Sequence, residues 1–187
     1  MEKRTIITMA GDLASGKGTV TTMLSEELGY EIYRNGDYFR KLGKEMGMSV
    51  TEFNEYVSSH PEIDRQIEES AREYAKEHEN LIVDARLGWY VVPESFKVYL
   101  KVDLDVAADR AFNDPKRKDS EYFETLEEQK ADLVKRYNLE NERYLEIYGI
   151  HKDDMNNYDY VLDTSNLTPN EVKEDLLNAY KKWLEDK

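Results

Sequence analysis

The sequence predicts an α/β protein with a five-stranded parallel sheet and helices on both faces. Two observations carry this prediction. Short apolar, β-branched runs alternate with longer segments of helical periodicity, and the first run leads into a loop bracketed by glycines. Parallel strands need crossover connections, which helices of this length provide. At 187 residues the chain suits one domain, which we expect to span residues 1–187.

The first strand is expected at residues 5–10, and the loop that follows it fits a phosphate-binding pattern. Gly11, Gly16 and Lys17 match G-x-x-x-x-G-K, in which backbone N–H groups surround an anion at the positive end of the next helix. Lys17 is expected to reach the terminal phosphates of a nucleoside triphosphate. The fold class is therefore a P-loop NTPase. Its predicted nucleotide-binding residues are Gly11, Asp12, Leu13, Ala14, Ser15, Gly16, Lys17, Gly18 and Thr19.

The residue after the lysine bears on the metal. Gly18 stands where the stricter pattern has a Ser or Thr hydroxyl for Mg²⁺, so we expect phosphate oxygens and water to hold most of the ion, and Thr19 to bond a phosphate. Asp84 ends an apolar strand and is predicted to orient a Mg²⁺-bound water. The alternative is that Asp84 only caps the next turn.

Composition limits the partners. The net charge of -14 repels nucleic acid and anionic membranes, so neither is an expected partner. The absence of cysteine excludes disulfides and thiolate metal sites. There is no signal-peptide pattern and no apolar run long enough to cross a bilayer. We therefore expect a cytoplasmic protein that concentrates positive charge locally wherever it binds phosphate.

Helix-capping residues indicate where several of the other predicted elements begin. Asp37 is a predicted N-cap, and Ser49 with Glu52 and Thr125 with Glu128 form capping boxes. The remaining strands are expected at 30–33, 80–85, 96–102 and 158–163, and the remaining helices at 37–46, 49–58, 61–77, 105–112, 125–148 and from 168 onward.

Two segments interrupt the alternation of strands and helices. Residues 37–78 form a mostly helical insertion between strands, and the polar, proline-containing segment 113–125 is a candidate lid. Such segments suit a site that closes over its ligands.

Arginines near these segments are the candidates for holding phosphate, because phosphoryl transfer needs positioning and charge neutralisation. Arg40 follows Asp37, and Arg86 lies beside the end of the third strand. Arg136 and Arg143 are two helical turns apart, about 10 Å along the axis. Arg110, with Lys116, Arg117 and Lys118, flanks the lid. The alternative is ordinary pairing of these arginines with glutamates such as Glu140.

With these residues in place, the chain resembles the nucleoside monophosphate kinases, and most closely the short cytidylate kinases. The resemblance covers nearly the whole chain, and Ala14 departs from it where that family frequently has glycine. The matching segments are GDLASGKGT (11–19), Gly36-Asp37 with Phe39-Arg40, GMSVTEF (47–53), PEIDR (61–65), DARLGW (84–89), RYLEIYGI (143–150) and YDYVLDT (158–164).

The resemblance implies transfer of the γ-phosphate of ATP to CMP or dCMP, with Mg²⁺. It implies that Arg40 and Arg86 hold the acceptor phosphate, with Asp37 nearby and Asp64 in the acceptor-binding segment. The residues that it assigns to the transferring group, beside Lys17, are Arg110, Arg136 and Arg143.

Two alternatives stay open. A kinase of a small hydroxylated metabolite would need a general base, and Asp37 is the candidate. A nucleotide-binding regulator without turnover is the other, although a GTPase is disfavoured because no N-K-x-D motif is present. The expected partners are small nucleotides. The sequence leaves open the base preference among CMP, dCMP and UMP, and whether the chain is a monomer or a dimer.

Overall fold

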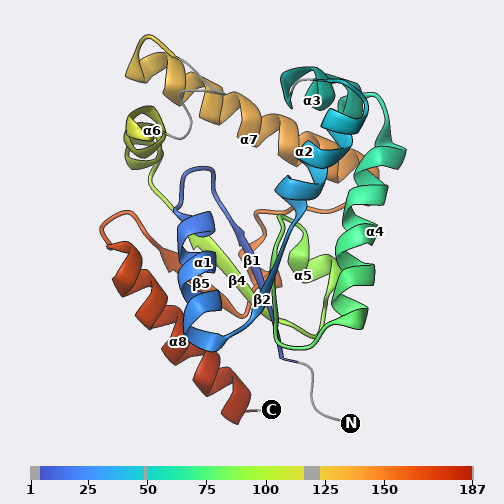
Figure 1. Cartoon of the computed structure of the whole chain (residues 1–187). Coiled ribbons are helices and arrows are strands. Elements are labelled where there is room, and N and C mark those ends of the chain that lie inside the picture. Colours follow the sequence, from blue (N-terminus) through green and yellow to red (C-terminus); the bar gives the residue numbers. More distant parts are fainter. Residues whose placement is uncertain (1–4, 49, 116–122, 187) are drawn as a thin grey trace.

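The computed structural model describes residues 5–48, 50–115 and 123–186, and it confirms the five-stranded parallel sheet (Figure 1). The strand order β2-β3-β1-β4-β5 places β1 at the centre, so the loop that follows β1 lies at the middle of the carboxyl edge. The strands are β1 (Ile6–Gly11), β2 (Glu31–Arg34), β3 (Leu81–Asp84), β4 (Phe96–Lys101) and β5 (Tyr160–Asp163).

Helices cover both faces of the sheet. On one face, α1 (Lys17–Leu28) and α8 (Pro169–Glu185) pack on alternate residues of β1, with Ile7 and Met9 in the core. On the other face, α4 (Pro61–Glu77) and α5 (Gly88–Val91) pack on β3. β1 is buried along its whole length, as a continuous apolar run in a parallel sheet requires.

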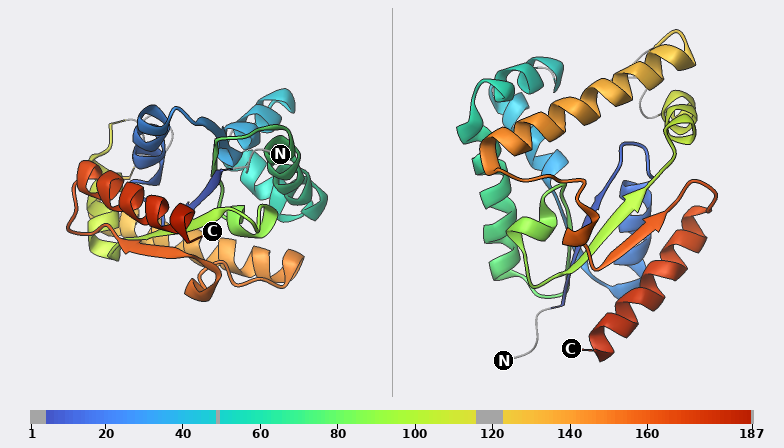
Figure 2. Two further views of the ribbon diagram at one scale, coloured as in Figure 1. Left: turned by 90° about the horizontal axis from the view of Figure 1, so that it is seen from below. Right: turned by 180° about the vertical axis from the view of Figure 1, so that it is seen from behind.

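The remaining helices lie beyond the carboxyl ends of the strands. α7 (Leu126–Tyr148) crosses above them, from α6 (Leu104–Asn113) at one end toward α4 at the other (Figures 1 and 2). The other elements of this region are α2 (Asn35–Glu45) and α3 (Val50–Ser58), whereas the short helix η1 (Met155–Asn157) lies at the amino end of β5. Within the described residues, no helix is both long and apolar enough to cross a membrane.

The Thr125–Glu128 capping box is confirmed, but the predicted start of α2 is wrong. α2 begins at Asn35, so Asp37 lies in its first turn and Arg34 occupies the N-cap position. Asp37 therefore does not cap the helix.

The helix α5 was not predicted, because four residues are too short for a periodic signal. Its close approach to the sheet depends on Gly88, where an added Cβ would lie 2.9 Å from the Cβ of Thr8. Two predicted features fall on residues outside those described, namely Ser49 of the other capping box and most of the lid (116–122, including Lys116, Arg117 and Lys118).

Candidate active site

The loop between β1 and α1 has the backbone that a phosphate nest needs. Gly16 has φ 83° and Ala14 has φ 61°, so two residues of the loop are left-handed. Glycine adopts this conformation without strain, whereas an alanine Cβ makes it sterically unfavourable. Ala14 therefore costs conformational free energy at a position where glycine would not. Gly11 is required for packing, because an added Cβ would lie 2.7 Å from the carbonyl oxygen of Leu100.

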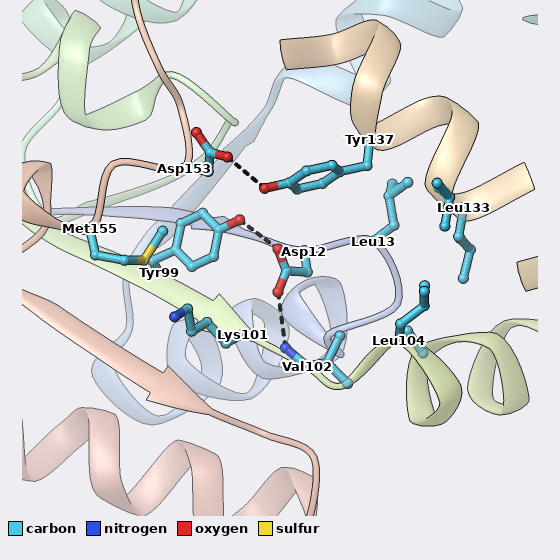
Figure 3. Close-up of a pocket in the computed structure, with 12 residues that line it drawn as sticks. Asp12, Leu13, Tyr99, Lys101, Val102, Leu104, Leu133, Tyr137, Asp153 and Met155 are labelled. Atoms are coloured by element: carbon cyan, nitrogen blue, oxygen red, sulfur yellow. Dashed lines mark hydrogen bonds between the residues drawn. The ribbon is translucent and has the colours of Figure 1, made fainter. Parts of the chain in front are cut away.

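The side chains of Asp12 and Leu13 line a cavity of about 370 Å³ between the loop and α7, with Asp12 directed toward Tyr99 and Val102 (Figure 3). The Asp12 carboxylate accepts hydrogen bonds from the Tyr99 hydroxyl at 2.6 Å and from the backbone N–H of Val102 at 3.0 Å. Asp12 therefore anchors the loop to the end of β4.

Lys17, the first residue of α1, lies at the end of β3. Its ammonium forms an ion pair with one oxygen of Asp84, and the Arg34 Nε lies 3.7 Å from the other oxygen. Burial lowers the pKa of Lys17, and the positive charges of Arg86 and Arg34 act in the same direction. Three cations thus crowd around the carboxyl ends of β2 and β3, and Asp84 is the anion between two of them.

Arg86 is held by an ion-pair network on α7. Its Nε donates to Glu140 at 2.6 Å, and the buried Lys152 Nζ donates to the same carboxylate oxygen at 2.8 Å. Burial alone would raise the pKa of Glu140, but the charges of Arg86 and Lys152 outweigh it and lower the pKa to about 2. Glu140 therefore stays ionised and fixes the orientation of the Arg86 guanidinium.

Arg143 pairs with α4, because its Nε lies 2.9 Å from the carboxylate of Asp64. One turn further along α4, the buried Glu68 accepts a hydrogen bond from the Asn35 amide at 3.1 Å. Burial raises the pKa of Asp64, and it raises that of Glu68 to about 7, with the charge of Asp64 as the next cause. This part of α4 thus carries two carboxyls, Asp64 and Glu68, that the protein compensates incompletely.

Arg110 and Arg136, which were also predicted to act on the transferring phosphoryl group, make contacts with other residues. Arg110 donates to the carbonyl oxygen of Thr164 at 2.7 Å, and the Thr164 hydroxyl bonds the carbonyl oxygen of Ser15, so Arg110 is tied to the flank of the P-loop. Arg136 lies 3.8 Å from Asp132 on its own helix.

Arg40 and Asp37 form an ion pair with each other on α2, and their side chains are 60% and 63% exposed. The structure does not join Arg40 to Arg86, the other arginine predicted to hold the acceptor phosphate.

Ion pairs thus join Lys17 to Asp84, Arg86 to Glu140 and Arg143 to Asp64 around the carboxyl ends of β2 and β3 and along α7, a group of charges called here the charged cluster. Arg40 and Asp37 lie at exposed positions of α2.

Sequence reasoning assigned no site role to four residues that belong to the charged cluster, contact it or lie one turn from it: Arg34, Glu68, Glu140 and Lys152. Arg34 is detectable only once β2 and β3 are paired, because the register sets it opposite Asp84. Glu140 was considered only as a surface partner for arginines, although it shares a face of α7 with Arg136 and Arg143. Lys152 and Glu68 belong to no motif and carry no local signal.

The donor set for Mg²⁺ is sparse. Within the described residues, no group of three or more acidic or histidine side chains is arranged to hold a metal ion. Asp84 supplies one carboxylate at the loop, which fits a Mg²⁺ ion that arrives with the triphosphate and keeps phosphate and water ligands.

Residues 6–166 match the cytidylate kinase-like family. The chain belongs to this family. The cytidylate kinase of Thermoplasma volcanium is 36% identical over 177 residues, which cover 92% of this chain and 89% of that protein. A protein of Lacinutrix mariniflava named S-adenosylmethionine-dependent nucleotide dehydratase is 33% identical over 96% of this chain, but the match spans 36% of that protein. The resemblance inferred from the motifs is confirmed.

Solved structures share the fold of this cytidylate kinase-like chain. An uncharacterized protein from Eubacterium ventriosum has a TM-score of 0.69 at 14% identity, over 95% of this chain and 99% of that one. The shikimate kinase from Acinetobacter baumannii in complex with shikimate has a TM-score of 0.59 at 18% identity, over 100% and 96%. At these identities the likeness shows the fold alone. Fold and family together confirm the predictions of a P-loop fold and of a phosphotransferase.

Proposed function

We propose that the chain transfers the γ-phosphate of ATP to CMP or dCMP, giving ADP and CDP or dCDP. The proposed architecture is one kinase domain with an acceptor-binding insertion at 37–78 and a lid at 113–125. The names of the cytidylate kinase relatives support this acceptor.

The observation that carries the proposal is the crowding of Lys17, Arg34 and Arg86 at the carboxyl edge of the sheet. The charges of Arg86 and Arg34 disfavour the charged form of Lys17. Four cations share two carboxylates here, because Asp84 faces Lys17 and Arg34, and Glu140 faces Arg86 and Lys152. Phosphate groups, one from each substrate, would neutralise the remaining positive charge, so these charges suit two phosphorylated substrates better than one.

The proposed roles follow the positions of the side chains. Arg86, held by Glu140, binds the acceptor phosphate, and Lys17 leaves Asp84 to bind the β- and γ-phosphates. Asp84 would hold Mg²⁺ through water, and the ion, when bound, neutralises charge on the phosphate oxygens. Arg110, Arg136 and Arg143 act on the transferring group, and Arg40, Asp37 and Asp64 line the acceptor side.

The chemistry needs no general base. An oxygen of the acceptor phosphate, already ionised at neutral pH, attacks the γ-phosphorus, and the bond to the β–γ bridging oxygen breaks. ADP leaves with that oxygen. A metabolite kinase would instead need Asp37 to accept a hydroxyl proton, but Asp37 is exposed and paired with Arg40.

A screen of acceptors tests the proposal. With Mg²⁺ and ATP, we expect ADP formation to depend on added CMP or dCMP, and Lys17→Met to lower turnover at least about 100-fold while circular dichroism stays unchanged. Turnover on shikimate-like alcohols with none on nucleoside monophosphates would favour the metabolite kinase. Nucleotide binding without any turnover would favour the regulator.

A further inference from the structure

Between α2 and α4, two side chains keep buried acceptor oxygens that have no hydrogen-bond partner. Asn35, at the start of α2, donates its amide N–H to one oxygen of Glu68 on α4, at 3.1 Å. This bond uses the donor side of the amide and fixes its orientation. The Oδ1 atom of Asn35 and the Oε2 atom of Glu68 remain, both buried and without a hydrogen-bond partner. Two neighbouring side chains therefore each keep a free acceptor.

The protein compensates this pair poorly. Glu68 is 5% exposed, and this burial disfavours its ionised form. The negative charge of Asp64, one turn away, disfavours that form further. Arg143 and Arg86 act in the opposite direction but are engaged by Asp64 and Glu140. Native proteins rarely leave buried acceptors unpaired, and unpaired ones often mark a ligand.

The surroundings suit a flat, polar ring. The ring of Tyr148 lies near that of Tyr90, with centroids 5.9 Å apart, and the buried Tyr148 hydroxyl also has no hydrogen-bond partner. Tyr148 follows Arg143 on α7, and Arg143 pairs with Asp64, which lies one turn before Glu68 on α4, so Tyr148 and Glu68 belong to two helices that are joined by this ion pair. Aromatic side chains beside polar acceptors are typical of sites that bind nucleobases.

We propose that Asn35 and Glu68 recognise the 4-amino group of the acceptor base, so that the enzyme selects cytosine over uracil. This inference rests on the proposed function. An amino group carries two hydrogens, and the pair offers two acceptor oxygens, one for each. Uracil has a carbonyl oxygen at the same position, and it would face two acceptors with no hydrogen between them. Glu140 and Arg143, on one face of α7, hold Arg86 and Asp64 respectively. Glu68 follows Asp64 by one turn of α4, so one nucleotide would reach from Arg86 to Glu68.

The test removes one group from the substrate and one from the protein. The analogue is the pyrimidin-2-one nucleotide, which is CMP with hydrogen in place of the 4-amino group. For the wild type, we expect kcat/KM to be on the order of 100-fold lower for this analogue and for UMP than for CMP. In Glu68→Gln, we expect the gap between CMP and UMP to shrink below about 10-fold, because the Gln amide also donates a hydrogen bond to the 4-carbonyl of uracil.

Two further variants keep the test decisive. Glu69→Gln changes the exposed neighbour on α4 and should keep the wild-type gap. Asn35→Ala removes the other acceptor and should lower kcat/KM for CMP about 10-fold more than for the analogue, with the KM for ATP unchanged.

The outcomes separate the two proposals. Base recognition by this pair is overturned if the wild type uses the analogue as well as CMP. It is also overturned if Glu68→Gln lowers kcat/KM for CMP and for UMP by the same factor. In both cases the CMP kinase proposal stands. If no nucleoside monophosphate is phosphorylated, the proposed function fails and this inference fails with it.

Discussion

Glu140 and Glu68 are glutamates with little exposure, at 15% of the side chain and 5% of the residue, yet the pKa of Glu140 is lowered to about 2 and that of Glu68 is raised to about 7. Glu140 receives hydrogen bonds from two cations, Arg86 and Lys152. Glu68 receives one from the neutral amide of Asn35. Burial acts in the same direction on both, so the difference lies in the partners.

This difference separates residues that build a site from residues that await a ligand. A carboxylate saturated by the protein's own cations fixes those cations and has nothing left to offer a substrate. A carboxyl with a free oxygen costs stability until a donor arrives, which is the usual trade between stability and function. Removing the charge of each glutamate should therefore change stability in opposite directions.

Glu140→Gln should have the larger effect and destabilise the protein by about 3 kcal/mol at pH 7.5. The lowering of the Glu140 pKa from its usual value to about 2 corresponds to this free energy, because the variant leaves Arg86 and Lys152 without a full counter-charge. Urea denaturation measures it. Glu142→Gln, at an exposed position of the same helix, should change the free energy of unfolding by less than about 0.5 kcal/mol. If Glu140→Gln changed the free energy of unfolding as little as Glu142→Gln does, the ion pairs of Glu140 with Arg86 and Lys152 would contribute no stability.

Glu68→Gln should stabilise the protein by about 1 to 3 kcal/mol under the same conditions. The amide has nearly the same volume and keeps an acceptor for Asn35, but its burial does not require a charge to leave water. The matched control is Glu69→Gln. A loss of more than about 1 kcal/mol in Glu68→Gln would show that the carboxylate is well compensated and would remove the contrast with Glu140.

Local signals explain why the centre of the site was predictable. The pattern around Gly11 and Lys17 lies within nine consecutive residues, and strand and helix flanks on either side are read by periodicity. The capping box at Thr125 is equally local, and it appears in the structure with both hydrogen bonds. The start of α2 was wrong because Asp37 is as acceptable in a first turn as at an N-cap.

The glutamates were not predictable for the opposite reason. Arg86 and Glu140 are 54 residues apart, and Asn35 and Glu68 are 33 apart, so only the packing of α7 and α4 around the sheet makes them partners. Their chemistry depends on burial and on the number of cations nearby, and neither is encoded in a spacing. The assignment of the arginines to phosphate stays a prediction, and the anions that hold Arg86 and Arg143 became visible only in the structure.

The smallest expected effect is the pH dependence of the same stabilities. A carboxyl whose pKa is raised on folding binds more protons in the folded state, so stability falls as pH rises from its usual pKa toward 7. The advantage of Glu68→Gln over the wild type should therefore shrink by about 1 kcal/mol between pH 6 and pH 5. Asp64, Arg143 and Arg86, which face Glu68, are present in both proteins, so their titration largely cancels in the difference.

Glu140 should show the opposite slope. Its pKa is lowered on folding, so its contribution is complete at neutral pH and is lost as pH falls from its usual pKa toward 2. Between pH 5 and pH 7.5, the difference between the wild type and Glu140→Gln should therefore stay nearly constant. Urea titrations at pH 5, 6 and 7.5 measure both slopes in one experiment. A constant difference for Glu68→Gln as well would mean that Glu68 is ionised in the folded protein throughout, held by partners as effectively as Glu140.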